Sequence, residues 1–189
     1  MAQWKELEDV FRPRQIHEDT VITLLAQNPD PTLVVAPRSV IDTIIRGGMD
    51  LPTEIGGILL GTAYVLPKSN SHLTHVRQSL FATGGEGSSS HFRFTSSSWE
   101  TMRKQIREEH VVIGWFHTHP GLGIFMSETD RRTQRHFFAQ PWQVSLVVDP
   151  ISGDYRFFAG MESEPVSEIL ISIQTRERCG GPWEESIQV

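Results

Sequence analysis

Two histidines, His117 and His119, stand at the end of an apolar run at residues 111–116. Residues two apart on a β-strand project from the same face, so both imidazole rings could reach one metal ion. Asp130 is the natural third ligand, because residues 127–130 fit the start of a helix that a short loop can fold back toward the histidines. Zinc accepts imidazole nitrogen and carboxylate oxygen, and a catalytic zinc keeps a fourth position for water. The spacing therefore predicts a metal site made of His117, His119 and Asp130.

Each part of this pattern also has an interpretation without metal. A His-x-His pair on a strand can be two surface imidazoles, and Ser127 with Asp130 is a capping-box pattern in its own right. The surroundings favour the metal, because the strand that delivers the histidines is too apolar to face water. Burying two imidazoles without partners would cost roughly a few kcal/mol.

The elements that must position these residues follow from hydrophobic periodicity and turn signals. Strands are expected at residues 33–35, 54–61, 73–81, 111–119, 143–148 and 155–158, the last two joined as a hairpin. Helices are expected from an N-cap at Ser39 to Gly47, from a capping box at residues 97–100 to about Glu109, from Ser127 to Phe138, and over residues 166–173. Such alternation predicts an α/β (α+β) fold with a mixed β-sheet flanked by helices.

The length of 189 residues suits one compact domain with short extensions. We predict an N-terminal arm at residues 1–31, a single domain at residues 32–178 and a flexible tail at residues 179–189. Within the domain, the Gly/Ser run at residues 84–90 contains nothing that could pack, so a mobile loop is expected there.

Composition narrows the class of partner. With 38% hydrophobic and 21% charged residues and a formal net charge of -6, the chain argues against nucleic acid or an anionic membrane as the main partner. The single cysteine, Cys179, excludes an intramolecular disulfide and a Cys-rich metal site. No apolar stretch approaches the length of a membrane span, and the N-terminus is charged where a signal peptide would be apolar. We therefore expect a cytoplasmic protein.

The histidine motif and its surroundings resemble a known family. His117-Thr118-His119, the seven residues that follow, and Ser127 with Asp130 match in full the signature His-Ser/Thr-His-x7-Ser-x2-Asp of the JAMM (JAB/MPN) metalloproteases. Glu54, at the head of a glycine-containing apolar run, is similar to the upstream glutamate that completes that signature. The resemblance covers about residues 32–160.

Membership of that family implies a fold like that of the cytidine deaminases and one zinc ion per chain with a bound catalytic water. The implied reaction is hydrolysis of peptide or isopeptide bonds, often at the C-terminus of ubiquitin or a ubiquitin-like protein, so that such a protein or its conjugates would be the substrate. Glu54 would act as general base and acid, and Ser127 would donate a hydrogen bond to the oxyanion. The compact chain resembles prokaryotic deubiquitinase-like members, which implies ubiquitin-activating and ubiquitin-conjugating homologues as partners.

Two other functions must be weighed against an active peptidase. Inactive MPN scaffolds bind partners without metal and typically lack one or more ligands, whereas this chain keeps the complete set. A zinc deaminase of the same fold needs a Pro-Cys-x-x-Cys motif, which a chain with one cysteine cannot supply. By the same resemblance, residues 80–94 lie where family members insert substrate-gripping residues. We expect this segment to order over a bound tail, with a passive surface loop as the alternative.

Overall fold

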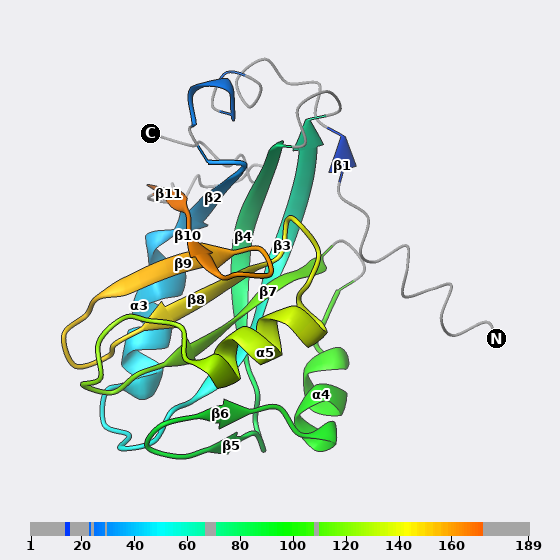
Figure 1. Cartoon of the computed structure of the whole chain (residues 1–189). Coiled ribbons are helices and arrows are strands. Elements are labelled where there is room, and N and C mark those ends of the chain that lie inside the picture. Colours follow the sequence, from blue (N-terminus) through cyan, green and yellow to red (C-terminus); the bar gives the residue numbers. More distant parts are fainter. Residues whose placement is uncertain are drawn as a thin grey trace, which may run out of the picture.

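The structure is a computed structural model that describes residues 14–15, 23, 25–28, 30–66, 71–107 and 110–171 (Figure 1). The predicted tail at residues 179–189 and most of the predicted arm at residues 1–31 lie outside the described residues. Leu25, which belongs to that arm, is buried against Leu33 and Leu73. The domain boundaries stay a prediction.

One mixed sheet dominates the described part of the chain. Its order is β10-β9-β8-β7-β3-β4-β2-β11, with β1 paired to the far end of β3. The strands are β1 (Arg14–Gln15), β2 (Thr32–Pro37), β3 (Gly56–Leu66), β4 (Ser71–Phe81), β7 (Val111–Thr118), β8 (Val144–Val148), β9 (Tyr155–Ala159), β10 (Glu164–Pro165) and β11 (Ser167–Ile171). Strand β7 pairs antiparallel with β3 and parallel with β8. The predicted mixed sheet is confirmed, as is the hairpin of β8 and β9.

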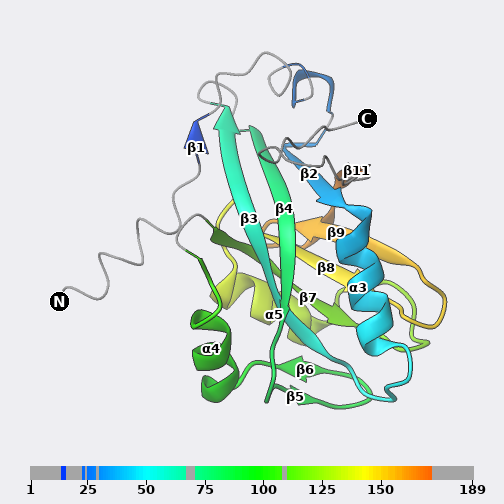
Figure 2. The ribbon, with the colours of Figure 1, turned by 180° about the vertical axis from the view of Figure 1, so that it is seen from behind.

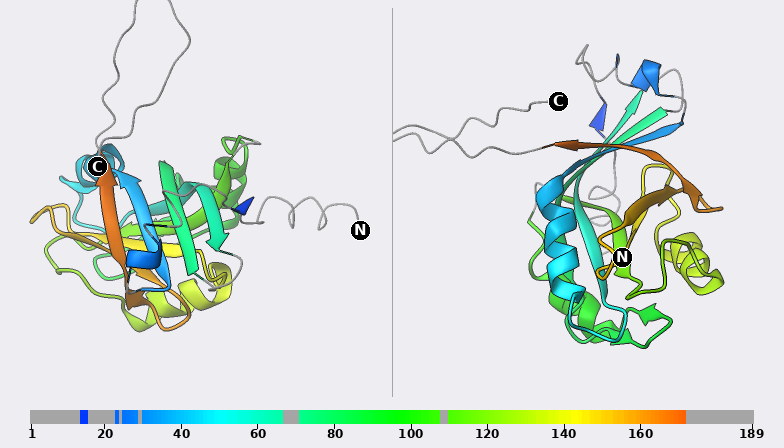
Figure 3. Two further views of the ribbon diagram at one scale, coloured as in Figure 1. Left: turned by 90° about the horizontal axis from the view of Figure 1, so that it is seen from above. Right: turned by 90° about the vertical axis from the view of Figure 1, so that its left-hand side faces the viewer.

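Helices cover both faces of this sheet. Helix α3 (Arg38–Gly48) lies on one side and α5 (Glu128–Phe137) on the other (Figures 2 and 3). Helix α4 (Ser96–Arg103) shares the α5 side, because its Met102 belongs to the same buried cluster as Phe138. A hydrophobic core lies on each face of the sheet, and alternate residues of β7 contribute to one or the other. Phe116 packs with α3, whereas Trp115 packs with α4 and α5.

Two predicted helix starts are wrong in detail. Pro37 occupies the N-cap position of α3 and no side chain caps it, so Ser39 is not the cap. Helix α4 begins after Thr95, whose side chain exchanges capping-box hydrogen bonds with Ser98, and it ends at Arg103, short of the expected Glu109. Thr95 is the better cap because its hydroxyl also donates to the Gly84 carbonyl, which ties the helix to the preceding loop.

The helix expected at residues 166–173 is also wrong, because Ser167–Ile171 forms strand β11, parallel to β2. The free edge of β2 offers backbone partners that no local pattern reveals. Asp30 fixes the register, since its Oδ2 accepts hydrogen bonds from the Ser167 backbone N–H (2.9 Å) and hydroxyl (2.6 Å). Tertiary pairing has overridden the helical spacing of the apolar residues.

Part of the Gly/Ser run forms a strand, which its composition did not predict, whereas the expected mobility of the run stays a prediction. Strands β5 (Glu86–Gly87) and β6 (Phe92–Arg93) form a small antiparallel hairpin with an ion pair between Glu86 and Arg93. Phe92 anchors it, because its side chain is only 4% exposed in the core beside α4. None of the helices that the structure describes combines the length and apolar character needed to cross a bilayer.

Candidate metal centre

The two histidines meet at the end of β7. His117 is fully buried and His119 is 1% exposed, and their Nε2 atoms lie 3.0 Å apart. His119 follows the last strand residue and stays extended because its backbone N–H donates to the carbonyl of Val148 in β8 (2.8 Å). The structure thus brings both rings to one point, as their two-residue spacing indicated.

Asp130 reaches the same point from the first turn of α5. Ser127 is the N-cap of this helix: its Oγ accepts from the Asp130 backbone N–H (3.2 Å), and Asp130 Oδ2 accepts from the Ser127 backbone N–H (2.8 Å). This capping box aims the carboxylate at the histidines. Asp130 Oδ2 lies 3.4 Å from Nε2 of His117 and 3.8 Å from Nε2 of His119.

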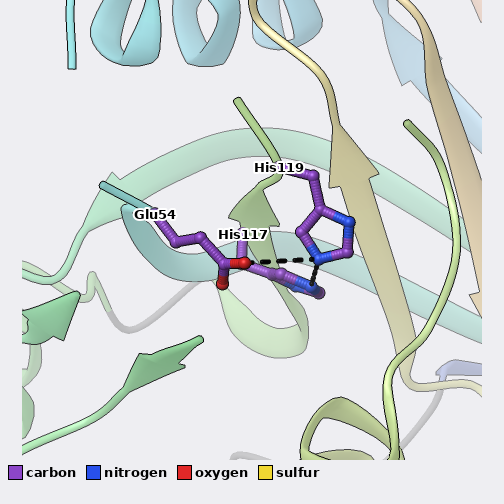
Figure 4. Close-up of side chains that lie close together, drawn as sticks. All are labelled: Glu54, His117 and His119. Carbon is purple, nitrogen blue, oxygen red and sulfur yellow. Dashed lines mark hydrogen bonds and ion pairs between the residues drawn. The ribbon is translucent and has the colours of Figure 1, made fainter. Parts of the chain in front are cut away.

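Glu54 points its carboxylate toward the two histidine rings (Figure 4). It lies two residues before β3 rather than on the predicted strand, and its backbone N–H donates to the carbonyl of Ser88 in the β5–β6 hairpin (2.7 Å). Its side chain is 2% exposed, with Oε1 3.7 Å from Nε2 of His119. Within the described residues, Oε2 has no hydrogen-bond partner.

Burial and neighbouring charges shift the pKa values of Glu54, Asp130 and His119 in different directions. Burial raises the pKa of Glu54 to about 7, against the attraction of His117. Burial also acts to raise the pKa of Asp130, but hydrogen bonds and attraction from His117 and Ser127 outweigh it and lower this pKa to about 2. Burial lowers the pKa of His119 to about 4. At neutral pH the structure therefore offers a neutral imidazole and an ionised Asp130, the forms that bind metal, together with a Glu54 able to exchange protons.

The donor set fits a tetrahedral ion. Two ligand atoms about 2.1 Å from such an ion lie roughly 3.4 Å apart. The distances among His117 Nε2, His119 Nε2 and Asp130 Oδ2 are 3.0, 3.4 and 3.8 Å, which bracket that value. Glu54 also offers an oxygen within 4.8 Å of both histidines. Asp130 lies close to both rings and is ionised, which favours it as the ligand and leaves Glu54 free.

Ser127 lies beside this centre, half-buried at the start of α5. Its Oγ accepts from Asp130, so its own hydroxyl proton is available to a further acceptor. In the part of the chain that the structure describes, this hydroxyl forms no hydrogen bond with Glu54 or the histidines. Its role toward an oxyanion stays a prediction.

Several residues around the centre were not predicted from sequence. Trp115 lies on the same strand face as His117, and its indole N–H donates to Oε1 of the buried Gln134 (2.8 Å). The two-residue spacing from His117 was a usable signal for Trp115. Asp149 is also buried, between a fully buried strand and a turn. An acidic residue in that position could have been recognised as a turn-capping group.

Comparison with known proteins agrees with the geometry. The family model described as "JAB1/Mov34/MPN/PAD-1 ubiquitin protease" matches residues 34–140, which include all five predicted site residues. Among curated relatives, the 26S proteasome non-ATPase regulatory subunit 14 of Dictyostelium discoideum is 28% identical over 125 residues, covering 64% of this chain and 39% of the relative. The ubiquitin carboxyl-terminal hydrolase RPN11 of Saccharomyces cerevisiae is 26% identical over 125 residues, with the same coverages.

The matched stretch thus spans less than half the length of these relatives. A solution structure of a protein from Desulfitobacterium hafniense superposes with a TM-score of 0.51 at 18% identity, covering 74% of this chain and 93% of that one. At that identity the likeness concerns the fold alone.

Proposed function

This chain belongs to the JAB1/Mov34/MPN/PAD-1 ubiquitin protease family, and from that premise we propose that it is a zinc-dependent metallopeptidase of the JAMM type. The proposed reaction is hydrolysis of a peptide or isopeptide bond at the C-terminus of a ubiquitin-like protein or its conjugates. One observation carries the proposal: His117, His119 and Asp130 converge within 3.8 Å of one another, and Glu54 faces them with a carboxylate oxygen that has no hydrogen-bond partner among the described residues.

In this proposal, His117 Nε2, His119 Nε2 and Asp130 Oδ2 hold one zinc ion. When bound, the ion lowers the pKa of its water and polarises the scissile carbonyl. Glu54 accepts a proton from the attacking water and delivers it to the leaving amine. The Glu54 carboxylate is buried and faces the proposed ligands, 3.7 Å from Nε2 of His119, which places it for both transfers. The Ser127 hydroxyl donates a hydrogen bond to the developing oxyanion.

The alternative is a catalytically inactive MPN scaffold that binds protein partners. This chain retains the complete proposed set of ligands and base, and within the described residues the buried Oε2 of Glu54 has no hydrogen-bond partner. A buried carboxylate oxygen without a partner costs stability, whereas the water of a metal centre would give it one, and this favours the enzyme.

The test combines metal analysis with cleavage. Purified chain should contain about one zinc per molecule and release the leaving group from an amide at the C-terminus of ubiquitin, or separate isopeptide-linked diubiquitin. Chain without zinc and without cleavage would be a scaffold. Chain with zinc that cleaves neither probe would contradict the substrate class while leaving the metal centre in place.

The wider setting rests on resemblance. The names of the relatives connect them with the proteasome and with ubiquitin hydrolysis, and on that basis we propose ubiquitin or ubiquitin-like conjugates as the substrate class. The activating and conjugating homologues expected as partners find no support in the comparisons and stay predictions. A cytoplasmic location likewise stays a prediction.

A further inference from the structure

Asp149 is a buried carboxylate bound by four backbone amides. It is 3% exposed, at the end of β8. Its Oδ1 accepts from the N–H groups of Gly121 (3.0 Å), Ile151 (2.9 Å) and Ser152 (3.4 Å), and its Oδ2 accepts from Gly123 (3.2 Å). Burial acts to raise the pKa of Asp149, but these donors outweigh it and hold the pKa below its ordinary value. The group is therefore a fixed anion that gathers two separate segments.

One of those segments leads directly to a metal-ligand candidate. Gly123 donates its N–H to Asp149, and its carbonyl oxygen lies 3.1 Å from Nδ1 of His119. A carbonyl only accepts, so Nδ1 carries the proton of this contact, and in the neutral ring Nε2 then presents its lone pair. That lone pair points at the place where His117 and Asp130 converge.

The backbone of residues 121–123 does not by itself hold the Gly123 carbonyl in this position. Gly121 and Gly123 both have φ in the left-handed region, at +70° and +81°. Glycine adopts such angles freely, so the loop could take many shapes if nothing tied it down. Gly121 and Gly123 donate their N–H groups to the two oxygens of Asp149, which lies just beyond the end of β8, and these bonds hold both glycines in place.

We propose that Asp149 is a positioning residue for the metal centre. It holds the Gly121–Gly123 loop so that the Gly123 carbonyl fixes the tautomer and orientation of His119, acting from outside the ligand set. The proposal rests on the proposed function in so far as His119 binds zinc. Its structural half, the fixed tautomer, can be measured without metal. Partners that hold the second nitrogen of a histidine ligand typically change metal affinity 10–100-fold when they are removed.

The decisive variant is Asp149→Asn, which keeps the shape but replaces one acceptor oxygen by an N–H₂ group. Asp154→Asn is the matched control, since Asp154 is an exposed carboxylate in the same β8–β9 turn. For each protein, the 15N chemical shifts of the His119 ring are measured in metal-free samples, and zinc affinity is measured by competition with a chelator. Circular dichroism establishes that the variants are folded.

Wild type and Asp154→Asn should show Nδ1 protonated and Nε2 unprotonated. Asp149→Asn should show a mixture of tautomers and zinc affinity reduced roughly 10-fold or more. A purely structural role in the turn would lower Tm without changing the tautomer, and that result, or unchanged zinc affinity in a folded variant, would overturn the proposal.

If Asp149→Asn does not fold, measurements on the wild-type protein alone test the proposal. Rapid exchange of the Gly123 amide together with an Nε2-protonated His119 would then overturn the proposal, and slow exchange with Nδ1 protonated would support it. If wild type binds no zinc, the proposed function fails, whereas the tautomer of His119 still tests the role of Asp149.

Discussion

Trp115 lies flat against His117, with their ring centroids 4.6 Å apart and their planes 13° from parallel. The indole is itself fixed from α5, because its N–H donates to Oε1 of Gln134. The amide nitrogen of Gln134 in turn donates to the carbonyls of Phe138 (2.9 Å) and Gln143 (3.3 Å). The Trp115 ring that supports His117 is thus held in place by the Gln134 amide, whose oxygen and nitrogen both have hydrogen-bond partners. A buried hydrogen-bond network of this kind is sensitive to the loss of any one of its side chains.

Gln134→Leu should destabilise the protein and leave the Trp115 ring less firmly held against His117. The substitution leaves the Trp115 N–H and two carbonyls without partners in a buried place, which costs about 1–3 kcal/mol for each group that finds no water. Urea denaturation measures the loss, and Gln140→Leu, at an exposed site near the end of α5, should change stability little. Equal stabilities of the two variants would show that the amide network contributes nothing.

His119→Ala should remove zinc while the fold survives. The imidazole contributes one of three proposed ligands, and His119 lies just beyond the last residue of β7, so the sheet should remain intact. Zinc per chain is measured by elemental analysis after dialysis, with the exposed His136→Ala as control. Stoichiometric zinc in His119→Ala would sink the ligand assignment.

Glu54→Gln should keep zinc but lose hydrolysis. The amide keeps the size of the side chain but cannot accept the proton of the attacking water, and proton transfer of this kind contributes roughly 10²–10⁴-fold to rate. The measurements are kcat/KM on a ubiquitin C-terminal amide and zinc content, with the exposed Glu164→Gln as control. Full activity in Glu54→Gln would mean that another group is the base.

The same substitution should stabilise the metal-free protein in a pH-dependent way. The folded state raises the pKa of Glu54 from 4.5 to about 7, so between these values the folded protein holds a proton that the unfolded chain has released. The contribution of Glu54 to wild-type stability therefore falls as pH rises through this window and levels off above pH 7, whereas the lowered pKa of His119 acts in the opposite direction between about pH 4 and 6.5.

Glutamine does not titrate, so the excess stability of Glu54→Gln should grow by about 2–3 kcal/mol from pH 4.5 to 7, at about 1.4 kcal/mol per unit. Chemical denaturation in the presence of a chelator measures this difference, in which the titration of other groups largely cancels. A difference that does not vary with pH would show that Glu54 ionises as freely when folded as when unfolded.

Gly87→Ala should impair catalysis through the position of the base. An added Cβ at Gly87 would lie 1.9 Å from the Glu54 carbonyl oxygen, so the hairpin or Glu54 must move. Displacing a catalytic group by about 1 Å can cost 10²-fold in rate. We expect kcat/KM to fall roughly 10–100-fold with zinc retained, and the exposed Ser89→Ala to behave as wild type. Unchanged kcat/KM in Gly87→Ala would mark the hairpin as a passive surface element.

Sequence reasoning located the part of the site that is local in the chain. His117 and His119 share a strand face by their spacing, and Asp130 belongs to a helix start whose capping box is visible in the sequence. Glu54 came only from the family resemblance, because its approach to the histidines depends on the pairing of β3 with β7. Gln134 and Asp149 were missed for the same reason: their partners lie on other elements.

The errors in the fold have a related cause. The apolar spacing at residues 166–173 fits a helix as well as it fits a strand. The segment forms strand β11 because it pairs with the edge of β2. The Gly/Ser run looked unable to pack because its anchor, Phe92, lies just beyond it and becomes buried only through tertiary contacts. Local composition describes the residues of such a segment but not the surface against which they fold.

The separation of Glu54 from the proposed ligands has a consequence for the denatured chain. His117, His119 and Asp130 stand within one short stretch, whereas Glu54 arrives only when Gly56 pairs with His117 across β3 and β7. An unfolded molecule keeps the three ligands close in sequence, so we expect it to retain weak affinity for zinc. Affinity for the unfolded state reduces the stabilisation that a metal gives to the native state. We therefore expect an unfolded chain to bind zinc weakly, whereas hydrolysis requires the pairing of β3 with β7 that brings Glu54 to the metal.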